Sequence, residues 1–104
     1  MIIDLNEKNF KNEVLDGKKP TLIDFYATWC PPCQALHPIF DALEKKYGEK
    51  INFGRLDVGE AEAVASQYGV MSVPTLIFFK EGKEIKKIAG LLSQDALEKI
   101  LDVF

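Results

Sequence analysis

An apolar run of strand length leads without a linker into an amphipathic helix, and this junction constrains the fold more than any other feature of the chain. Residues Thr21–Tyr26 read T-L-I-D-F-Y, a β-branched and aromatic run that is typical of a strand. From Pro32 to Tyr47 apolar side chains recur at helical spacing, and Gly48 then ends the helix. A strand that passes directly into a covering helix favours parallel strands joined by crossover helices.

The rest of the chain continues this alternation. Further strands are expected at Met1–Leu5, Ile51–Asp57, Thr75–Lys80 and Glu84–Ala89. Further helices are expected from Asn6 to about Asp16, at Glu60–Tyr68, and after Ser93, which caps a helix with one apolar side formed by Leu97, Ile100, Leu101 and Phe104. The turn Glu81–Gly82 makes the last two strands a hairpin. The order predicts an α/β fold with a mixed sheet covered on both faces.

Length and charge narrow the classes of function. A chain of 104 residues fits a single domain, here 1–104, that can fold without a metal or a disulfide. The net charge of -3 leaves no electrostatic footprint for nucleic acid. The first residues lack a basic leader and an apolar signal region, and no run reaches the length of a membrane span. We therefore expect a cytoplasmic protein that binds neither nucleic acid nor membrane.

Both cysteines of the chain, Cys30 and Cys33, lie two residues apart at the junction. A disulfide between them closes too short a loop to stabilise the fold much, so we expect a chemical role for the pair. Cys30 falls at the helix N-terminus, where free backbone N–H groups and the helix dipole favour the thiolate. Cys33 lies one turn later, facing the core, as the less accessible sulfur. We expect Cys30 to be the nucleophile and Cys33 the sulfur that resolves a mixed disulfide.

The two cysteines also allow other interpretations. Cys30, Cys33 and His37 supply three metal ligands, but a structural zinc site takes four and the chain has no other Cys or His, so no metal is expected. The two cysteines could also be small buried hydrophobes. His37 by itself is expected at the surface or boundary of the helix, with no assigned role.

The two residues between the cysteines are both prolines. Pro32 suits the first helical turn, where its fixed φ and missing N–H cost nothing. Pro31 removes a further N–H, so backbone donors reach the Cys30 thiolate only from Cys33 onward, and the double proline stiffens the ring. Fewer donors destabilise the thiolate whereas stiffness favours the closed disulfide, and the sequence leaves the sign of the net effect on the reduction potential open.

Asp24 is the one charged residue in its strand. A buried, unpaired carboxylate costs several kcal/mol when ionised, so either its pKa is raised or it has a partner. One interpretation is that Asp24 lies beneath the helix and exchanges a proton with Cys33 through a water molecule. The other is an exposed edge residue without a role. Arg55, in the neighbouring strand, could pair with Asp24 or serve the surface.

Two further features lie near the cysteines in the predicted fold. The bond between Val73 and Pro74 precedes a central strand, where a cis peptide is one way to accommodate the proline. Trp29 is either a core aromatic or, beside a solvent-facing Cys30 thiol, part of an apolar contact surface.

Taken together, these segments resemble the thioredoxin family over essentially the whole chain. The residues that carry the resemblance are I-D-F-Y-A-T-W-C-P-P-C at Ile23–Cys33, Pro38, S-V-P-T at Ser72–Thr75, F-F-K-E-G-K at Phe78–Lys83, and Gly90. The resemblance implies a five-stranded sheet of order 1-3-2-4-5 with four helices on its two faces. It also implies that Pro74 is cis and lies against the cysteines, that Asp24 is buried, and that Arg55 replaces the family's usual lysine.

The resemblance also implies a docking surface around Cys30 for an extended substrate chain, which pairs in β fashion with the backbone beside Pro74. Its members would be Trp29, Pro31, Ser72, Val73, Pro74 and Gly90. The chain departs from the usual W-C-G-P-C-K in having Pro31 and Gln34, and Met71-Ser72 replaces the commoner arginine-glycine. These departures concern the reduction potential and the choice of partner.

The function expected from the resemblance is the reduction of disulfides in partner proteins, as part of cell redox homeostasis. A monomer without a bound cofactor would be re-reduced by a thioredoxin reductase. The alternatives are a disulfide oxidant or isomerase, a thioredoxin-like binding module whose thiols are idle, and a dimer bridged by metal through the two cysteines. The reduction potential separates a reductase from an oxidant.

Overall fold

The structure, a computed structural model, describes residues 1–103, and Phe104, which the sequence assigns to the apolar side of the last helix, lies outside the described residues. The strands are β1 (Ile2–Leu5), β2 (Thr21–Tyr26), β3 (Asn52–Asp57), β4 (Thr75–Lys80) and β5 (Lys83–Ala89). The helices are a π-helix η1 (Lys11–Leu15) and the α-helices α1 (Pro31–Tyr47), α2 (Glu62–Gln67) and α3 (Gln94–Leu101). None of the described helices is both long and apolar enough to cross a membrane.

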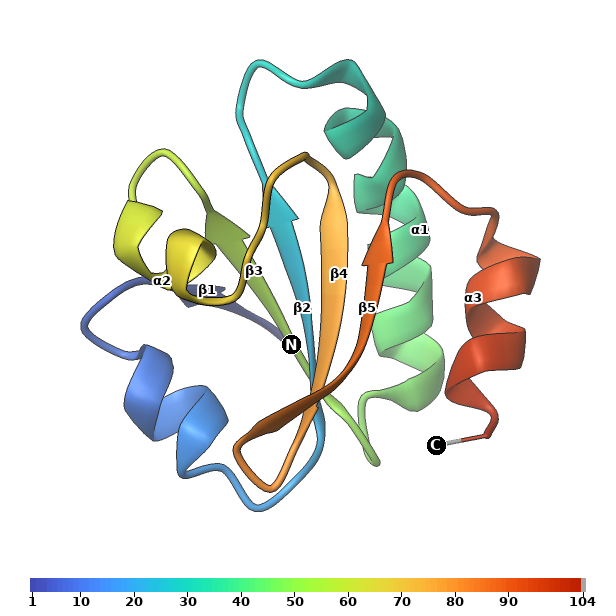
Figure 1. Cartoon of the computed structure of the whole chain (residues 1–104). Coiled ribbons are helices and arrows are strands. Elements are labelled where there is room, and N and C mark those ends of the chain that lie inside the picture. Colours follow the sequence, from blue (N-terminus) through green and yellow to red (C-terminus); the bar gives the residue numbers. More distant parts are fainter. Residues whose placement is uncertain (104) are drawn as a thin grey trace.

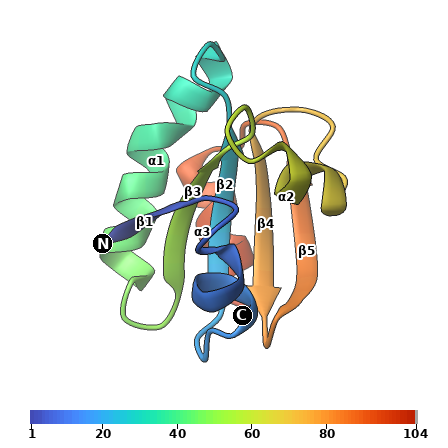
Figure 2. The ribbon, with the colours of Figure 1, turned by 90° about the vertical axis from the view of Figure 1, so that its left-hand side faces the viewer.

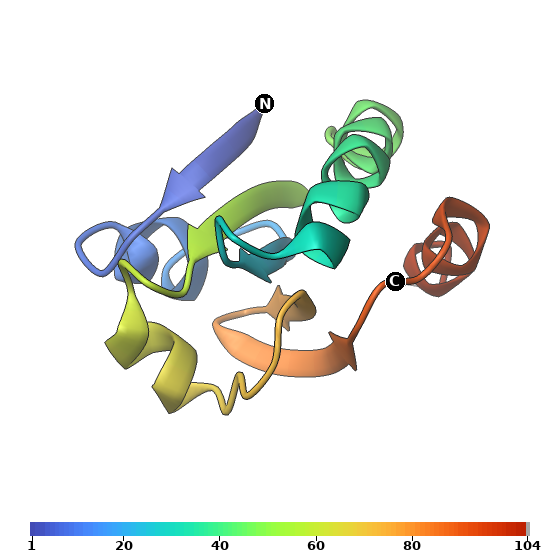
Figure 3. The same ribbon diagram turned by 90° about the horizontal axis from the view of Figure 1, so that it is seen from above.

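The five strands form one sheet in the order β1-β3-β2-β4-β5, as expected (Figure 1). Strand β3 pairs in parallel with β1 and β2, whereas β4 is antiparallel to β2 and β5. Seen from above, α1 and α3 cover one face of the sheet, and η1 and α2 cover the other (Figure 3). Turned so that η1 and α2 face the viewer, the molecule shows its strands side by side, with α3 behind the sheet (Figure 2). The thioredoxin fold predicted from the sequence is confirmed.

Side chains of β2 alternate between two hydrophobic clusters. Ile23 and Phe25 pack in the cluster under η1 and α2, and Leu22 packs in the cluster under α1 and α3. Strand β4 divides its side chains in the same way, with Ile77 and Phe79 on one face and Leu76 and Phe78 on the other. Because successive side chains point to opposite faces of a strand, Asp24 lies on the face that α1 covers.

The first predicted helix is shorter than its pattern suggests. The Asn6 side chain accepts hydrogen bonds from the backbone N–H groups of Lys8 and Asn9 at 2.8 and 2.9 Å, while the Asn6 N–H donates to Asn9 Oδ1. The Phe10 N–H also donates to the Asn6 carbonyl at 3.1 Å, so Asn6 caps a first helical turn as predicted. The regular helix η1 begins at Lys11, about one turn later than the pattern suggests.

The β4–β5 hairpin depends on Gly82. Glu81 and Gly82 both have positive φ, 54° and 76°, as a tight two-residue hairpin turn requires. A Cβ on Gly82 would also lie 2.7 Å from the backbone oxygen of Leu15. The turn therefore packs directly against the end of η1, so the β4–β5 hairpin contacts the helical layer formed by η1 and α2.

Candidate active site

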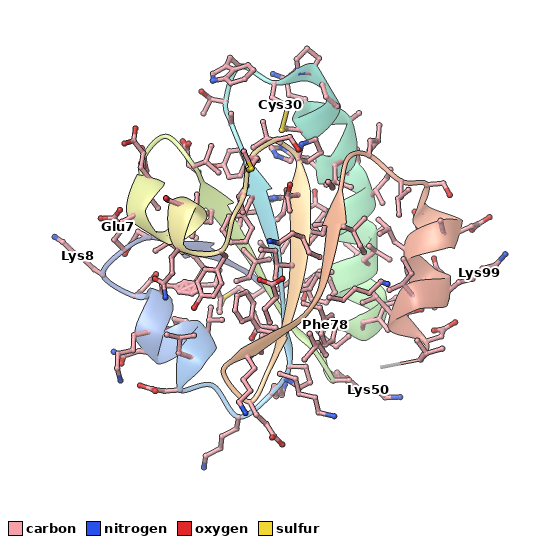
Figure 4. The ribbon with its side chains drawn as sticks, viewed as in Figure 1. Glu7, Lys8, Cys30, Lys50, Phe78 and Lys99 are labelled. Carbon is pink, nitrogen blue, oxygen red and sulfur yellow. A yellow bond between two sulfur atoms is a disulfide. The ribbon has the colours of Figure 1, made fainter. Side chains whose placement is uncertain are left out.

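Cys30 lies directly before the first turn of the long helix α1. The chain leaves β2 at Tyr26, and a hydrogen bond of 3.3 Å from the Cys30 N–H to the Ala27 carbonyl turns it toward α1. Cys30 is the N-cap, in extended conformation, and Pro31 and Pro32 are the first two helical residues. Figure 4 shows Cys30 at the end of the molecule where α1 begins. The helix thus starts one residue before the predicted Pro32.

Cys30 and Cys33 form a disulfide, with their Cα atoms 5.2 Å apart. The Cys33 N–H donates a hydrogen bond to Cys30 Sγ at 3.2 Å. The next amide, that of Gln34, is used by the Cys30 carbonyl at 3.1 Å. Since both residues between the cysteines are prolines, Cys33 is the nearest backbone donor to the Cys30 sulfur, as the sequence predicted.

Both sulfur-bearing residues are buried in the oxidised protein. Cys33 is 0% exposed and Cys30 2%, and they pack with Ala27, Tyr26 and Val73. The expectation of a solvent-facing Cys30 was wrong for the oxidised protein, because the side chain packs against these neighbours. Trp29, in contrast, is 77% exposed, so it is a surface aromatic and not a core residue.

A groove of about 440 Å³ opens beside the disulfide. Its lining residues come from the junction before α1, the end of β3 and the segment before β4, and they are Trp29, Cys30, Pro31, Pro32, Val58, Val70, Met71, Ser72 and Val73. Apart from Ser72 these residues are apolar or sulfur-bearing. An exposed apolar groove at a reactive sulfur is suited to an extended segment of another chain.

The loop before β4 is held close to the disulfide. Cys30 Sγ lies 3.7 Å from the Val73 carbonyl oxygen. The Val73–Pro74 peptide bond is cis, the isomer that the family resemblance implies. Thr75 Oγ1 donates to the Ser72 carbonyl at 2.7 Å, and the Gly90 N–H donates to the Pro74 carbonyl at 2.8 Å. These bonds fix the position of the Val73 carbonyl relative to the sulfur.

The predicted docking surface is only partly the observed groove. Pro74 is buried, and neither Pro74 nor Gly90 lines the groove. The Gly90 N–H instead donates a hydrogen bond to the Pro74 carbonyl where β4 and β5 begin to pair. Sequence reasoning did not place Val58 and Val70 in the groove. The sequence signal available for Val58 was its position directly after β3. In the structure the Val58 N–H donates to the carbonyl of Tyr26, the last residue of β2, at 2.9 Å.

Asp24 is fully buried on the side of the sheet that faces α1. Burial raises its pKa from 3.8 to about 7, against a smaller lowering by the Arg55 guanidinium. An acid with a pKa near neutrality can both give and accept a proton at physiological pH. The interpretation of Asp24 as an exposed edge residue was therefore wrong.

Arg55 lies opposite Asp24 in the β2–β3 register, and its side chain is 19% exposed. Its Nε atom is 3.8 Å from Asp24 Oδ2, whereas its Nη2 donates to Asp41 Oδ1 at 2.9 Å. Both roles that the sequence left open for Arg55, a partner of Asp24 and a surface residue, are present at once.

His37 is half-buried on α1 and packs edge-on against Tyr26, with ring centroids 5.4 Å apart. Burial lowers its pKa, with a further lowering by Arg55 and an opposite effect of Asp41. Over residues 1–103 no group of three or more Cys, His, Asp or Glu side chains is arranged to hold a metal ion.

Comparisons with known proteins agree with this geometry. The family model described as Thioredoxin matches residues 1–103. The chain is 36% identical over 98 residues to Thioredoxin 1 of Synechococcus elongatus, covering 94% of this chain and 92% of the relative. It is 39% identical over 114 residues to the Thioredoxin of Borreliella burgdorferi, covering 100% and 97%. It is 38% identical over 102 residues to the chloroplastic Thioredoxin M-type of Spinacia oleracea, covering 94% of this chain but only 56% of that longer relative.

Proposed function

Because the chain belongs to the thioredoxin family, we propose that it reduces disulfides in partner proteins by dithiol–disulfide exchange at Cys30 and Cys33. The family and the cysteine pair identify it as a thiol–disulfide oxidoreductase of the protein-disulfide reductase type. The observation that carries the proposal is the Cys30–Cys33 disulfide at the N-terminus of α1, beside an apolar groove.

In the proposed reaction the reduced Cys30 thiolate attacks one sulfur of a substrate disulfide. A bond forms between Cys30 and that sulfur, and the other substrate sulfur leaves as a thiolate. The Cys33 thiolate then attacks Cys30 Sγ, which releases the second substrate thiolate and closes the Cys30–Cys33 disulfide. Two electrons pass to the substrate, and the exchange itself needs no bound cofactor.

The N-terminus of α1 supports Cys30 as the nucleophile. The positive end of the helix and the Cys33 N–H, 3.2 Å from Cys30 Sγ, stabilise a negative charge on this sulfur. Cys33 is fully buried and reaches only the sulfur of Cys30 without rearrangement. This arrangement supports the order in which Cys30 reacts first and Cys33 resolves.

Asp24 is proposed to exchange a proton with the Cys33 thiol through a water molecule. The carboxylate accepts the thiol proton as Cys33 attacks, and returns it when the dithiol is regenerated. A pKa of about 7 suits both directions at neutral pH. The position of Asp24 on the face beneath α1 supports this role.

The substrate segment is proposed to lie in the groove, with Trp29, Pro31 and Ser72 in contact with its side chains. Its backbone would pair with Val73 in β fashion, next to Cys30 Sγ. Pro32 lines the groove, whereas the cis Pro74 would hold Val73 in place beside it, and the Gly90 N–H holds the Pro74 carbonyl by a hydrogen bond. We further propose that residues 1–104 act as one monomeric domain in the cytoplasm, with a thioredoxin reductase as electron donor.

Turbidity from insulin reduction by dithiothreitol tests the activity. We expect the protein to accelerate the reaction and Cys30→Ser to abolish the acceleration. Cys33→Ser is the matched control: it should accumulate a covalent mixed disulfide with the substrate that Cys30→Ser does not form. If Cys30→Ser matched the wild-type rate, the reductase function would be wrong, and a binding module with idle thiols would replace it.

A measured reduction potential distinguishes reduction from oxidation or isomerisation. Equilibration against a glutathione or dithiothreitol series is expected to give a value on the reducing side of glutathione. A value well on the oxidising side would assign the same exchange chemistry to a disulfide oxidant or isomerase.

A further inference from the structure

The Arg55 guanidinium is held at one end. Its Nη2 donates to Asp41 Oδ1 at 2.9 Å and to the His37 carbonyl at 3.1 Å, both on α1. Its carbon centre lies 5.4 Å from the centroid of the Phe40 ring, which supports the group from the core side. Three neighbours on α1 therefore fix the orientation of a side chain that originates on β3.

The other end of the guanidinium faces Asp24 without a hydrogen bond. Arg55 Nε and Asp24 Oδ2 are 3.8 Å apart, which is beyond hydrogen-bond distance. Within residues 1–103 neither Asp24 oxygen nor Arg55 Nε is hydrogen-bonded to another protein group. A buried carboxylate beside a guanidinium normally forms a short, often bidentate pair. The half-exposed Asp41 has the short bond instead, although Asp24 is the fully buried carboxylate.

We propose that Asp41 is a positioning residue that keeps the Arg55 guanidinium turned toward the outer side of α1, so that it does not close a hydrogen-bonded ion pair with Asp24. The inference rests on the proposed proton exchange between Asp24 and Cys33, which needs an Asp24 that can still be protonated. It assigns control of this buried acid to a surface carboxylate that touches neither the cysteines nor the groove.

The charged groups around Asp24 determine how a change at Arg55 affects the Asp24 pKa. Arg55 from β3 is the cation beside it, and α1 contributes His37 and Asp41 to the same cluster. Strand β1 brings the exposed Asp4 into register with Arg55. At the ends of β2 and β3, Tyr26 and Asp57 lie opposite each other. Strand β4 places the apolar Leu76 opposite Asp24. With Arg55 held by Asp41, burial dominates and the Asp24 pKa is about 7. A closed pair with Arg55 would lower it.

The test is a ¹³C NMR titration of the Asp24 carboxyl in the oxidised protein, where the cysteines do not titrate. Asp41→Ala removes the charged acceptor of Arg55 Nη2 and leaves only the His37 carbonyl and the Phe40 ring, so the guanidinium can turn toward Asp24 and the Asp24 pKa should fall by about one unit or more. Asp41→Asn is the matched variant: it loses the same charge but keeps an oxygen that Arg55 can bond to. We expect Asp41→Asn to move the Asp24 pKa by clearly less than Asp41→Ala.

A double-mutant cycle separates positioning from a direct effect of the Asp41 charge. In an Arg55→Met background, Asp41→Ala should leave the Asp24 pKa nearly unchanged. Equal shifts for Asp41→Ala and Asp41→Asn, a shift that persists without Arg55, or no shift at all would each overturn the proposal. This readout does not depend on reductase activity, so failure of the proposed function would appear separately in the insulin assay.

The kinetic counterpart is the pH profile of resolution. When a mixed disulfide on Cys30 is resolved by Cys33, the arm of the profile that reports Asp24 should move to lower pH in Asp41→Ala, in step with the NMR value. A pKa that moves in the NMR titration with an unchanged rate profile would support the positioning role of Asp41 and remove Asp24 from the proton exchange.

Discussion

Asp24 couples the stability of the protein to pH, because a fully buried carboxyl has a different pKa when folded and unfolded. Burial raises the folded pKa from 3.8 to about 7, so the folded state binds the proton more tightly than the unfolded chain. The stabilisation from the protonated form is complete below the unfolded pKa. This stabilisation is lost as the pH rises toward and through the folded pKa of about 7. Above this pH the buried, ionised Asp24 destabilises the folded state to its full extent.

Asp24→Asn should remove this pH dependence. A difference between 3.8 and about 7 corresponds to about 4 kcal/mol of differential stability. Relative to wild type, the oxidised variant should therefore become more stable by up to about this amount between pH 4 and pH 9. Urea unfolding at the two pH values measures the change. A variant-minus-wild-type difference that is the same at both would show that Asp24 titrates alike in the folded and unfolded states.

The sequence reveals an oddity such as Asp24, since a charged residue in an apolar strand has to be explained by burial or by an edge. It does not reveal how Arg55 is shared. The decisive partner, Asp41, lies 14 residues away on a different element, and only the packing of α1 on β3 brings the two together. The division of one guanidinium between two carboxylates depends on tertiary distances that no local pattern encodes.

At the scale of one element, the N-terminus of α1 limits the hydrogen bonds that the Cys30 sulfur can accept. An N-cap side chain accepts from the N–H of the second or third helical residue. Here Pro31 and Pro32 occupy the first two positions, so the bond comes from the third, Cys33. The helix therefore offers the Cys30 thiolate fewer donors than a proline-free turn would.

Pro32→Ala should lower the pKa of the Cys30 thiol, because it adds an N–H at the second position within reach of the sulfur. A charge-assisted hydrogen bond contributes about 1.5 kcal/mol, or about one pKa unit. Iodoacetamide alkylation rates against pH, in a Cys33→Ser background, measure this directly. Pro31→Ala is the control: its new N–H lies at the first position and should shift the profile less. Equal shifts for both variants would mean that the stiffness of the proline pair, not donor supply, sets the pKa.

Element prediction succeeded where the apolar pattern and the packing agree. Strands β2 and β4 have their predicted bounds, since each is buried on both faces of the sheet. The Ser93 cap is also confirmed, with the Ala96 N–H donating to Ser93 Oγ at 3.2 Å. The stretch after Asn6 keeps its predicted cap, but its first turn is not part of the regular helix η1. The groove was predicted only in part, since Val58 and Val70 enter it through the meeting of separate loops.

At the scale of the whole molecule, the two layers of helices share a single sheet. Strands β2 and β4 contribute side chains to both hydrophobic clusters. If one layer of helices detached from the sheet, the strands that also form the other cluster would be exposed to solvent. The Gly82 turn adds a direct contact between the hairpin and the end of η1. Residues 1–103 are thus expected to unfold as one cooperative unit.

Two probes at different places test this cooperativity. Fluorescence of Trp29, the one tryptophan of the chain, reports on the end of the molecule that carries the disulfide, and far-ultraviolet circular dichroism reports on the helices of both layers. Their urea transitions should coincide. Phe10→Ala beneath one layer and Leu101→Ala beneath the other should each lower the free energy of unfolding by about 3 kcal/mol and move both probes together. A transition in which Leu101→Ala shifts one probe and leaves the other in place would mean that the layers unfold separately, and the proposed single domain would have to be divided along the sheet.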